Sequence, residues 1–237
     1  SLICVQSSFS SDRFISLGAN QEKMITTGSL KFDSDNTIDD KSIKTLKKII
    51  GDRKITVFAS TREGEEKQIF ESYINSADNI DSLLIIIPRH PERFNEVFKL
   101  AKASGFKVER RSSTLQCSDD TDILIGDTMG EMMSYYSVCD LAFIGGSLSD
   151  NGGQNMLEAA SLSKPIIFGP SVFNFEEISK KLLRSDAAIQ VANADELMST
   201  ISDLLKSDQR REQLGVNAKK TFDQNRGAVN EILEVIT

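Results

Sequence analysis

The segment 143–160, FIGGSLSDNGGQNMLEAA, decides the fold. It joins the apolar run Leu141–Ile144 to a helical pattern over Asn155–Ser161, and a second apolar run, Pro165–Phe168, follows. Short apolar runs that alternate with amphipathic stretches indicate parallel strands joined by crossover helices. Because these runs lack polar alternation, we expect the strands to be buried on both faces of a sheet.

The same alternation continues through the rest of the chain. The further expected strands are Leu2–Gln6, Met24–Thr27, Ile55–Ala59, Leu83–Ile87 and Ile123–Ile125. The further expected helices are Ser11–Leu17, Asp39–Ile50, Glu63–Tyr73, Arg93–Ser104, Met129–Val138 and Phe175–Leu183, with more helix over 194–236. This order predicts an α/β fold, a Rossmann-like parallel sheet flanked by helices.

We expect three parts along the chain. Residues 1–32 are too short to fold alone, and we interpret them as the tail end of an N-terminal domain that this sequence lacks. Residues 33–40, DSDNTIDD, are polar and turn-rich, which is typical of a linker. Residues 41–237 are expected to form the main domain. The chain begins with Ser1 inside an expected strand, which also points to an upstream part.

Composition excludes several classes of protein. The 237 residues carry 28 Lys and Arg against 35 Asp and Glu, for a net charge of −7. A general nucleic-acid binder needs a basic face, so no nucleic-acid partner is expected. Three separated cysteines and one histidine leave no metal site or disulfide framework. The longest apolar run, Leu83–Ile87, is too short to span a membrane, so we expect this segment itself to be soluble.

Ligands of open α/β sheets bind beyond the carboxyl ends of the strands, and four loops lie there. In the first loop, ASTREGEE (59–66), Ser60 and Glu63 have capping-box spacing. The alternative is that the hydroxyl of Ser60 or Thr61 faces a ligand. In the second, PRHPERF (88–94), Arg89 suits a phosphate or carboxylate, and the alternative is a rigid turn with solvated charges. His90 is the one histidine of the sequence, and a lone histidine is more often structural than catalytic.

The third loop, GDTMGE (126–131), offers another capping box, from Thr128 to Glu131, with Gly130 in the first helical turn. The fourth is the glycine-rich loop of segment 143–160. Its glycines let a phosphate approach backbone amides, and a carboxylate at Glu158 suits the two hydroxyls of a ribose. Asn155 and Glu158 are three residues apart and are expected to share one helical face. The alternative is a mobile surface loop.

On these motifs the chain resembles the 3-deoxy-D-manno-octulosonic acid (Kdo) transferases, a family of GT-B glycosyltransferases, in their C-terminal donor-binding half. The matching segments follow the family's order and cover nearly the whole chain; they are GSLKFD (28–33), ASTREGEE, PRHPERF, GDTMGE, FIGGSL (143–148), GGQNMLEAA (152–160) and GPSVFNFEE (169–177). The resemblance implies transfer of Kdo from CMP-Kdo to a lipid A precursor in lipopolysaccharide biosynthesis, with inversion and without a cofactor or metal.

The resemblance also implies a set of site residues. Those expected to bind the CMP moiety are Pro88, Arg89, Met129, Gly130, Glu131, Asn155, Met156, Leu157 and Glu158. Those expected to form the floor of the donor site are Ser60, Gly145, Gly146, Ser147, Gly152 and Gly153. The chain departs from the family at Arg62 and Ser171, often His there, and at Gln154 and Met156, usually His and Pro. These departures affect the side of the site that holds the sugar.

The resemblance assigns three further features to the absent N-terminal half: the membrane anchor, the lipid acceptor site and the carboxylate that serves as catalytic base. It implies an enzyme at the cytoplasmic face of the bacterial inner membrane. Nothing in this chain suits the base that must deprotonate the acceptor hydroxyl. We therefore expect no catalytic residue here, and a chain that binds donor but is inactive alone.

Two alternatives stay open. Another GT-B glycosyltransferase that uses a UDP-sugar would share the glycine loop and Glu158, and nucleotide preference separates the two. A non-catalytic nucleotide-binding module would explain the missing base. Restoring the upstream half should give activity only if the chain is part of an enzyme.

Overall fold

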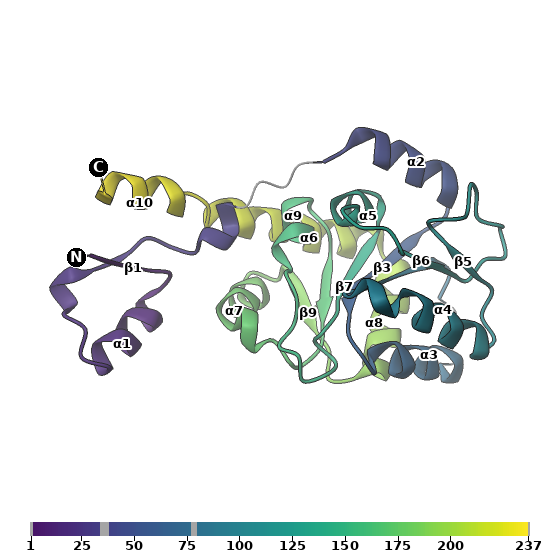
Figure 1. The fold of residues 1–237 in the computed structure, drawn as a ribbon, viewed down its shortest axis with the longest axis horizontal. Coiled ribbons are helices and arrows are strands. Elements are labelled where there is room, and N and C mark those ends of the chain that lie inside the picture. The colour runs from purple at the N-terminus through teal and green to yellow at the C-terminus, as the bar shows by residue number, and fades with distance from the viewer. Residues whose placement is uncertain (1, 34–37, 77–79, 237) are drawn as a thin grey trace.

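The computed structural model describes residues 2–33, 38–76 and 80–236 (Figure 1). Its centre is a parallel seven-stranded sheet in the order β5-β6-β4-β3-β7-β8-β9. The strands are β3 (Ile55–Thr61), β4 (Leu83–Pro88), β5 (Val108–Arg110), β6 (Ile123–Ile125), β7 (Leu141–Ile144), β8 (Ile166–Phe168) and β9 (Ala188–Gln190). The predicted Rossmann-like α/β fold is confirmed.

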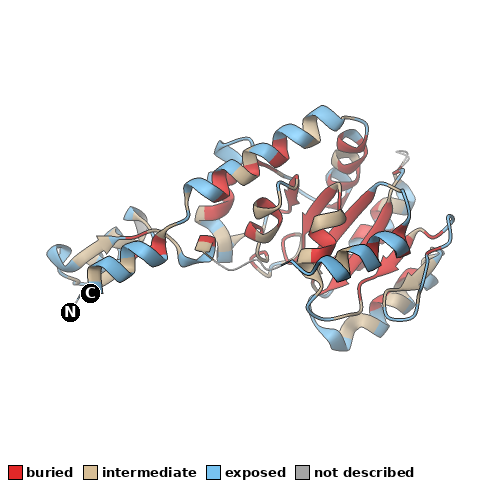
Figure 2. Cartoon of the chain, turned by 90° about the horizontal axis from the view of Figure 1, so that it is seen from above, coloured by how far each residue is buried: buried red, intermediate tan, exposed pale blue. Residues whose placement is uncertain are grey.

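Helices cover both faces of this sheet, so its central strands are buried except at Ser60, which is half-buried (Figure 2). One face packs against α2 (Asp40–Ile50), α5 (Met132–Val138), α6 (Leu157–Ser161), α7 (Glu176–Arg184) and α9 (Asp208–Gln224). The other packs against α3 (Glu65–Asn75), α4 (Phe94–Ala103) and α8 (Ala194–Leu205). Neighbouring residues of β3 show the division, because Val57 belongs to the first core and Phe58 to the second. This two-sided burial explains the apolar runs of the sequence.

The sequence patterns do not predict the two edge strands. β5 and β9 have three residues each, and neither is an apolar run. Only one side of an edge strand pairs with a neighbour, and these residues are mostly half-buried or exposed. Their sequences therefore lack the signal that marks β4 or β7.

The N-terminal segment lies apart from the sheet, beside the last helix (Figure 1). It holds β1 (Ile3–Val5), α1 (Ser8–Ser16), η1 (Gln21–Lys23), β2 (Met24–Thr26) and η2 (Leu30–Asp33), and β1 pairs with β2 in parallel. The Asp33 carboxylate accepts the Gly227 and Val229 amides, at 2.7 and 2.9 Å, where α10 (Ala228–Ile236) begins. Phe32 is buried in the main core.

The expected linker, 33–40, is therefore bounded by ordered elements. Asp33 ends η2 and Asp40 begins α2, while residues 34–37 lie outside the described residues. Within the described ranges, no helix is both long enough and apolar enough to cross a lipid bilayer.

Candidate functional site

The loops that follow β3, β4, β6 and β7 meet at the carboxyl edge of the sheet. These four strands are neighbours in the order β6-β4-β3-β7. Each of the four sequence motifs described above therefore reaches the same edge, as the parallel topology requires.

A single buried carboxylate organises the glycine-rich loop. Oε1 of Glu65 accepts the amides of Ser147 and Leu148, at 2.9 and 2.8 Å. Oε2 accepts the amides of Gly146 and Arg62, at 2.6 and 2.8 Å. Two of the expected floor residues, Gly146 and Ser147, therefore donate their backbone amides to a carboxylate inside the protein. These amides are therefore not available to a phosphate, and the role of the two residues as the floor of the donor site stays a prediction.

The side chain and carbonyl of Ser147 tie the same loop to the next strand. Its hydroxyl accepts the amide of Gly169 at 2.8 Å, and its carbonyl accepts the amide of Ser171 at 2.9 Å. The hydroxyl of Ser171 then accepts the amide of Gly152 at 3.0 Å, and the Gly153 amide donates to the Gly146 carbonyl at 2.8 Å. The loop is closed on itself by these hydrogen bonds and its glycines are buried, which favours a fixed loop over the alternative of a mobile surface loop.

Two of the loop glycines are required by close contacts. A Cβ at Gly145 would stand 2.6 Å from Thr61 Cα, and one at Gly152 would stand 2.5 Å from the ring of Phe173. Gly152 also has φ +74, a conformation that disfavours residues with a Cβ. At Gly145 glycine lets two backbone segments approach one another, whereas at Gly152 it leaves room for the side chains of Phe173 and Asn174.

Ser60 does not cap a helix. It has φ +55 and lies in the irregularity where the register of β3 and β4 shifts between Ala59 and Thr61. The next helix, α3, begins at Glu65, after Gly64 with φ +87, so the predicted Ser60–Glu63 capping box is wrong. Two residues with positive φ in this loop delay the helix by two positions.

Glu158 in α6 and Arg89, which follows β4, lie within electrostatic range of one another. Asn155 precedes α6 rather than sharing its face, yet its Nδ2 donates to Glu158 Oε1 at 3.1 Å. Burial raises the pKa of Glu158, while the hydrogen bond from Asn155 and the nearby positive charge of Arg89 oppose that rise. Arg89 is exposed, directly after the buried Pro88. The pair combines an accessible guanidinium with a carboxylate held in a partly desolvated position.

Two of the expected CMP-binding side chains point into the protein. Met156 and Leu157 are fully buried in the core beneath α6. Any contact that they make with a ligand would come from their backbone.

In the GDTMGE loop the carboxylate of Glu131 already has partners. It accepts from Arg111 at 2.8 Å and from the hydroxyl of Thr128. The helix α5 begins only at Met132, so the Thr128–Glu131 capping box and the helical position of Gly130 were predicted wrongly. Met129 is 67% exposed. Arg111 was not predicted as a site residue, because it follows β5, a strand that the sequence patterns do not predict.

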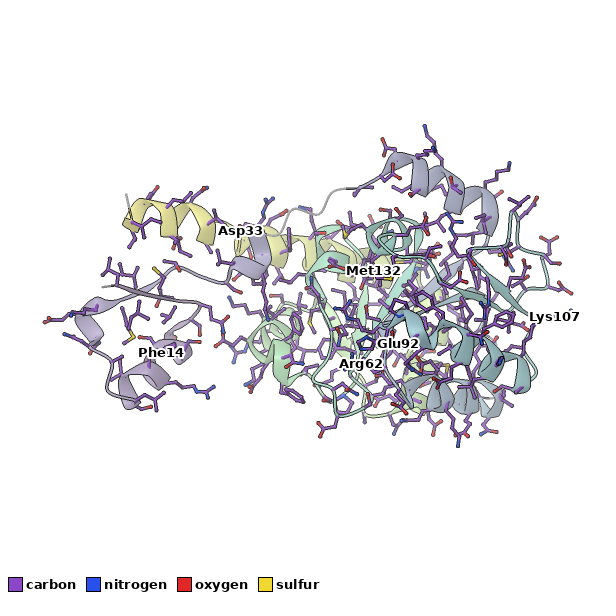
Figure 3. All side chains as sticks on the ribbon, viewed as in Figure 1. Phe14, Asp33, Arg62, Glu92, Lys107 and Met132 are labelled. Atoms are coloured by element: carbon purple, nitrogen blue, oxygen red, sulfur yellow. The ribbon has the colours of Figure 1, made fainter. Side chains whose placement is uncertain are left out.

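The PRHPERF loop contributes a buried ion pair. Arg93 makes two hydrogen bonds of 2.9 Å to the carboxylate of Glu66, which also accepts the hydroxyl of Thr61 at 2.7 Å. His90 contacts the guanidinium of Arg62, which reaches Asn151 Oδ1 at 3.5 Å. An open groove lies here, lined among others by Arg62, Glu63 and Glu92, two of them labelled in Figure 3. Among the described residues, no group of His, Cys, Asp and Glu is arranged to hold a metal ion.

Comparison with known proteins gives consistent results. The family model for glycosyl transferases group 1 matches residues 79–221. A 3-deoxy-D-manno-octulosonic acid transferase of Haemophilus influenzae is 39% identical over 243 residues, covering 100% of this chain and 56% of that protein. The Bordetella pertussis transferase is 32% identical, covering 94% of this chain and 53% of that protein. The chain spans about half the length of the curated relatives it matches.

Solved structures agree with this assignment. The C-terminal CMP-Kdo binding domain of WaaA from Acinetobacter baumannii is 31% identical, with a TM-score of 0.69 over 76% of this chain and 95% of that one. Anabaena HepE in complex with UDP has a TM-score of 0.62 at 14% identity, covering 100% of this chain and 63% of that one, and shares the fold alone. These matches confirm a GT-B C-terminal domain. The chain belongs to the group 1 glycosyltransferases and, within them, to the Kdo transferase family.

Proposed function

We propose that this chain binds the CMP moiety of CMP-Kdo, for transfer of Kdo to a lipid A precursor in lipopolysaccharide biosynthesis. The observation that carries the proposal is the placement of Arg89, after β4, and Glu158, after β7, at the same carboxyl edge of the sheet, close enough for the guanidinium to act on the carboxylate electrostatically. Relatives named as Kdo transferases, and a solved domain named for CMP-Kdo binding, support it.

The two charges suit the phosphate and the ribose of a nucleoside monophosphate. The guanidinium of Arg89 offers a fork of hydrogen bonds to the phosphate, and the carboxylate of Glu158 accepts the ribose hydroxyls. As the bond to Kdo breaks, negative charge grows on the departing CMP. A preorganised cation such as Arg89 then stabilises the transition state more than the ground state.

The proposal assigns the remaining parts of the reaction to residues outside this sequence. A base must remove the proton of the acceptor hydroxyl as it attacks the donor carbon. We assign that base, the acceptor site and the attachment to the cytoplasmic face of the inner membrane to an N-terminal half. Residues 1–32 would be the end of that half, and 33–40 its link to the donor-binding domain. The mechanism proposed is inverting.

Calorimetric titration with CMP, and with UDP for comparison, tests the proposed ligand. We expect CMP to bind more tightly than UDP, and Arg89→Ala to weaken CMP binding by about tenfold or more, because hydrogen bonds to charged groups contribute about 1.5–3 kcal/mol. Arg226→Ala, an exposed arginine beside Asp33, serves as the control and should leave CMP binding unchanged. Tighter binding of UDP would instead favour a UDP-sugar transferase.

Glu158→Gln should separate stability from binding. Because burial raises the pKa of Glu158, the folded state holds the proton more tightly than the unfolded chain does. Stability therefore falls as the pH rises through that pKa, and the ionised carboxylate is a cost at neutral pH. Glutamine removes the charge and keeps an oxygen for Asn155, so we expect a higher melting temperature together with weaker CMP binding.

The pH dependence of wild-type binding checks the same point. CMP affinity should fall as the pH drops through the raised pKa of Glu158. The fall should be smaller in Glu158→Gln, where only protonation of the phosphate and base of CMP remains to weaken binding. A variant that loses stability without losing affinity would contradict the role of Glu158 in ribose binding.

A further inference from the structure

Glu65 stands where a bound anion would stand. Each of its carboxylate oxygens accepts two backbone amides, and three of the four amides belong to the consecutive residues 146–148. Consecutive amides that converge in a glycine-rich turn are an arrangement that commonly binds phosphate or another anion. Here the anion is part of the protein, and Glu65 is fully buried.

This carboxylate joins three loops of the site. Its own loop follows β3, and the amides of residues 146–148 belong to the loop after β7. Through Ser147 the contact extends to Gly169 and Ser171, after β8. The loop then closes with the bond from Gly153 to Gly146, two residues before Asn155. The position of Asn155, and through it that of Glu158, therefore depends on a loop whose amides converge on Glu65.

We propose that Glu65 is a positioning residue for donor binding: its carboxylate replaces an anionic ligand inside the glycine loop and fixes the loop in the shape that presents Asn155 and Glu158 to the nucleotide. The donor phosphate accordingly binds elsewhere at this edge, not on the amides of residues 146–148. The part of this inference that concerns donor affinity rests on the proposed function.

The adjacent Glu66 provides a matched control. It is equally buried and also lies in the first turn of α3. Its carboxylate, however, accepts from Arg93 and Thr61 and makes no bond to the glycine loop. A general effect of removing a buried charge from this helix should appear in both variants, whereas loss of loop positioning should appear only at residue 65.

The first test uses Glu65→Gln and Glu66→Gln without ligand. A glutamine at 65 turns an NH₂ group toward two of the four amides, so it cannot satisfy all of them. Nuclear magnetic resonance should show faster hydrogen exchange at the amides of residues 146–148 in Glu65→Gln, and wild-type exchange there in Glu66→Gln. Unchanged exchange at these amides in Glu65→Gln, or an equal change in both variants, would overturn the proposal.

The second test is chemical rescue of CMP binding. Glu65→Ala should bind CMP about tenfold more weakly or worse, a loss of about 1.4 kcal/mol or more. Sodium formate should restore most of that affinity, with sodium chloride at equal ionic strength as the control, because formate can occupy the vacated amides. Glu66→Ala should not respond to formate. Absence of rescue in a folded Glu65→Ala would overturn the role in binding, and if this variant does not fold, CMP affinity of Glu65→Gln against Glu66→Gln decides.

The two proposals fail in different ways. If the wild-type chain binds no CMP, the proposed function fails for this chain, and the ligand-free exchange of residues 146–148 still decides whether Glu65 holds the loop. If the wild type binds CMP and Glu65→Gln binds it equally well, only the positioning role fails.

Discussion

Arg93→Ala is expected to lower the free energy of unfolding by about 3–5 kcal/mol, the usual cost of removing one partner of a buried ion pair. The side chain of Arg93 is 11% exposed and that of Glu66 only 1%. The variant would leave the Glu66 carboxylate buried with the hydroxyl of Thr61 as its remaining partner. Urea denaturation followed by circular dichroism measures the loss.

Arg210→Ala is the control for this experiment. Arg210 also makes two hydrogen bonds to one carboxylate, that of Asp186, at 2.6 and 2.7 Å. Here the side chains are 41% and 55% exposed, so water replaces the lost partner. We expect a loss of about 0.2–1 kcal/mol. Equal losses in the two variants would contradict the assignment of the difference to burial.

Gly145→Ala is expected to cost about 1–3 kcal/mol, the usual penalty for a group forced into a packed interior. The new Cβ would stand 2.6–2.7 Å from Thr61 Cα, Thr61 N and Ser60 O, all of them backbone atoms that cannot rotate away. The glycine loop would have to move off β3, so CMP binding should weaken as well. Denaturation and calorimetry on the same preparation measure the two effects.

Gly105→Ala is the control that measures backbone strain without the steric contact expected in Gly145→Ala. Gly105 has φ +93 but open space around its Cα, so alanine there meets no atom within 4 Å. Its cost should be the conformational strain of about 1–2 kcal/mol, with CMP affinity unchanged. If Gly145→Ala kept full affinity for CMP, the glycine loop would not need its contact with β3.

Much of the fold was predictable because strands that are buried on both faces of a sheet appear in the sequence as continuous apolar runs. β4 and β7 are uninterrupted apolar runs, whereas the order of the strands in the sheet was not predicted. The presence of Arg89 and Glu158 at one edge was predictable, because each follows a strand of a parallel sheet.

The role of Glu65 could not be predicted from local patterns. The capping-box spacing selected Glu63, but positive φ at Ser60 and Gly64 moves the helix start to Glu65. The three loop amides that Glu65 holds are 81–83 residues away in the chain. Arg111 was missed in a similar way, since its partner Glu131 lies 20 residues away and its strand is too short to be recognised. A hydrogen bond or ion pair between residues that are far apart in the chain produces no periodic pattern in the sequence.

In the proposed complex, CMP binds between the loop after β4, which carries Arg89, and helix α6, which carries Glu158. Titration of the isotope-labelled wild-type chain with CMP, followed by amide nuclear magnetic resonance, tests it most directly. We expect the largest changes in amide chemical shift at Arg89, Gly130, Asn155 and Glu158. Largest changes at the separate groove lined by Lys31 and Phe173 instead would contradict it.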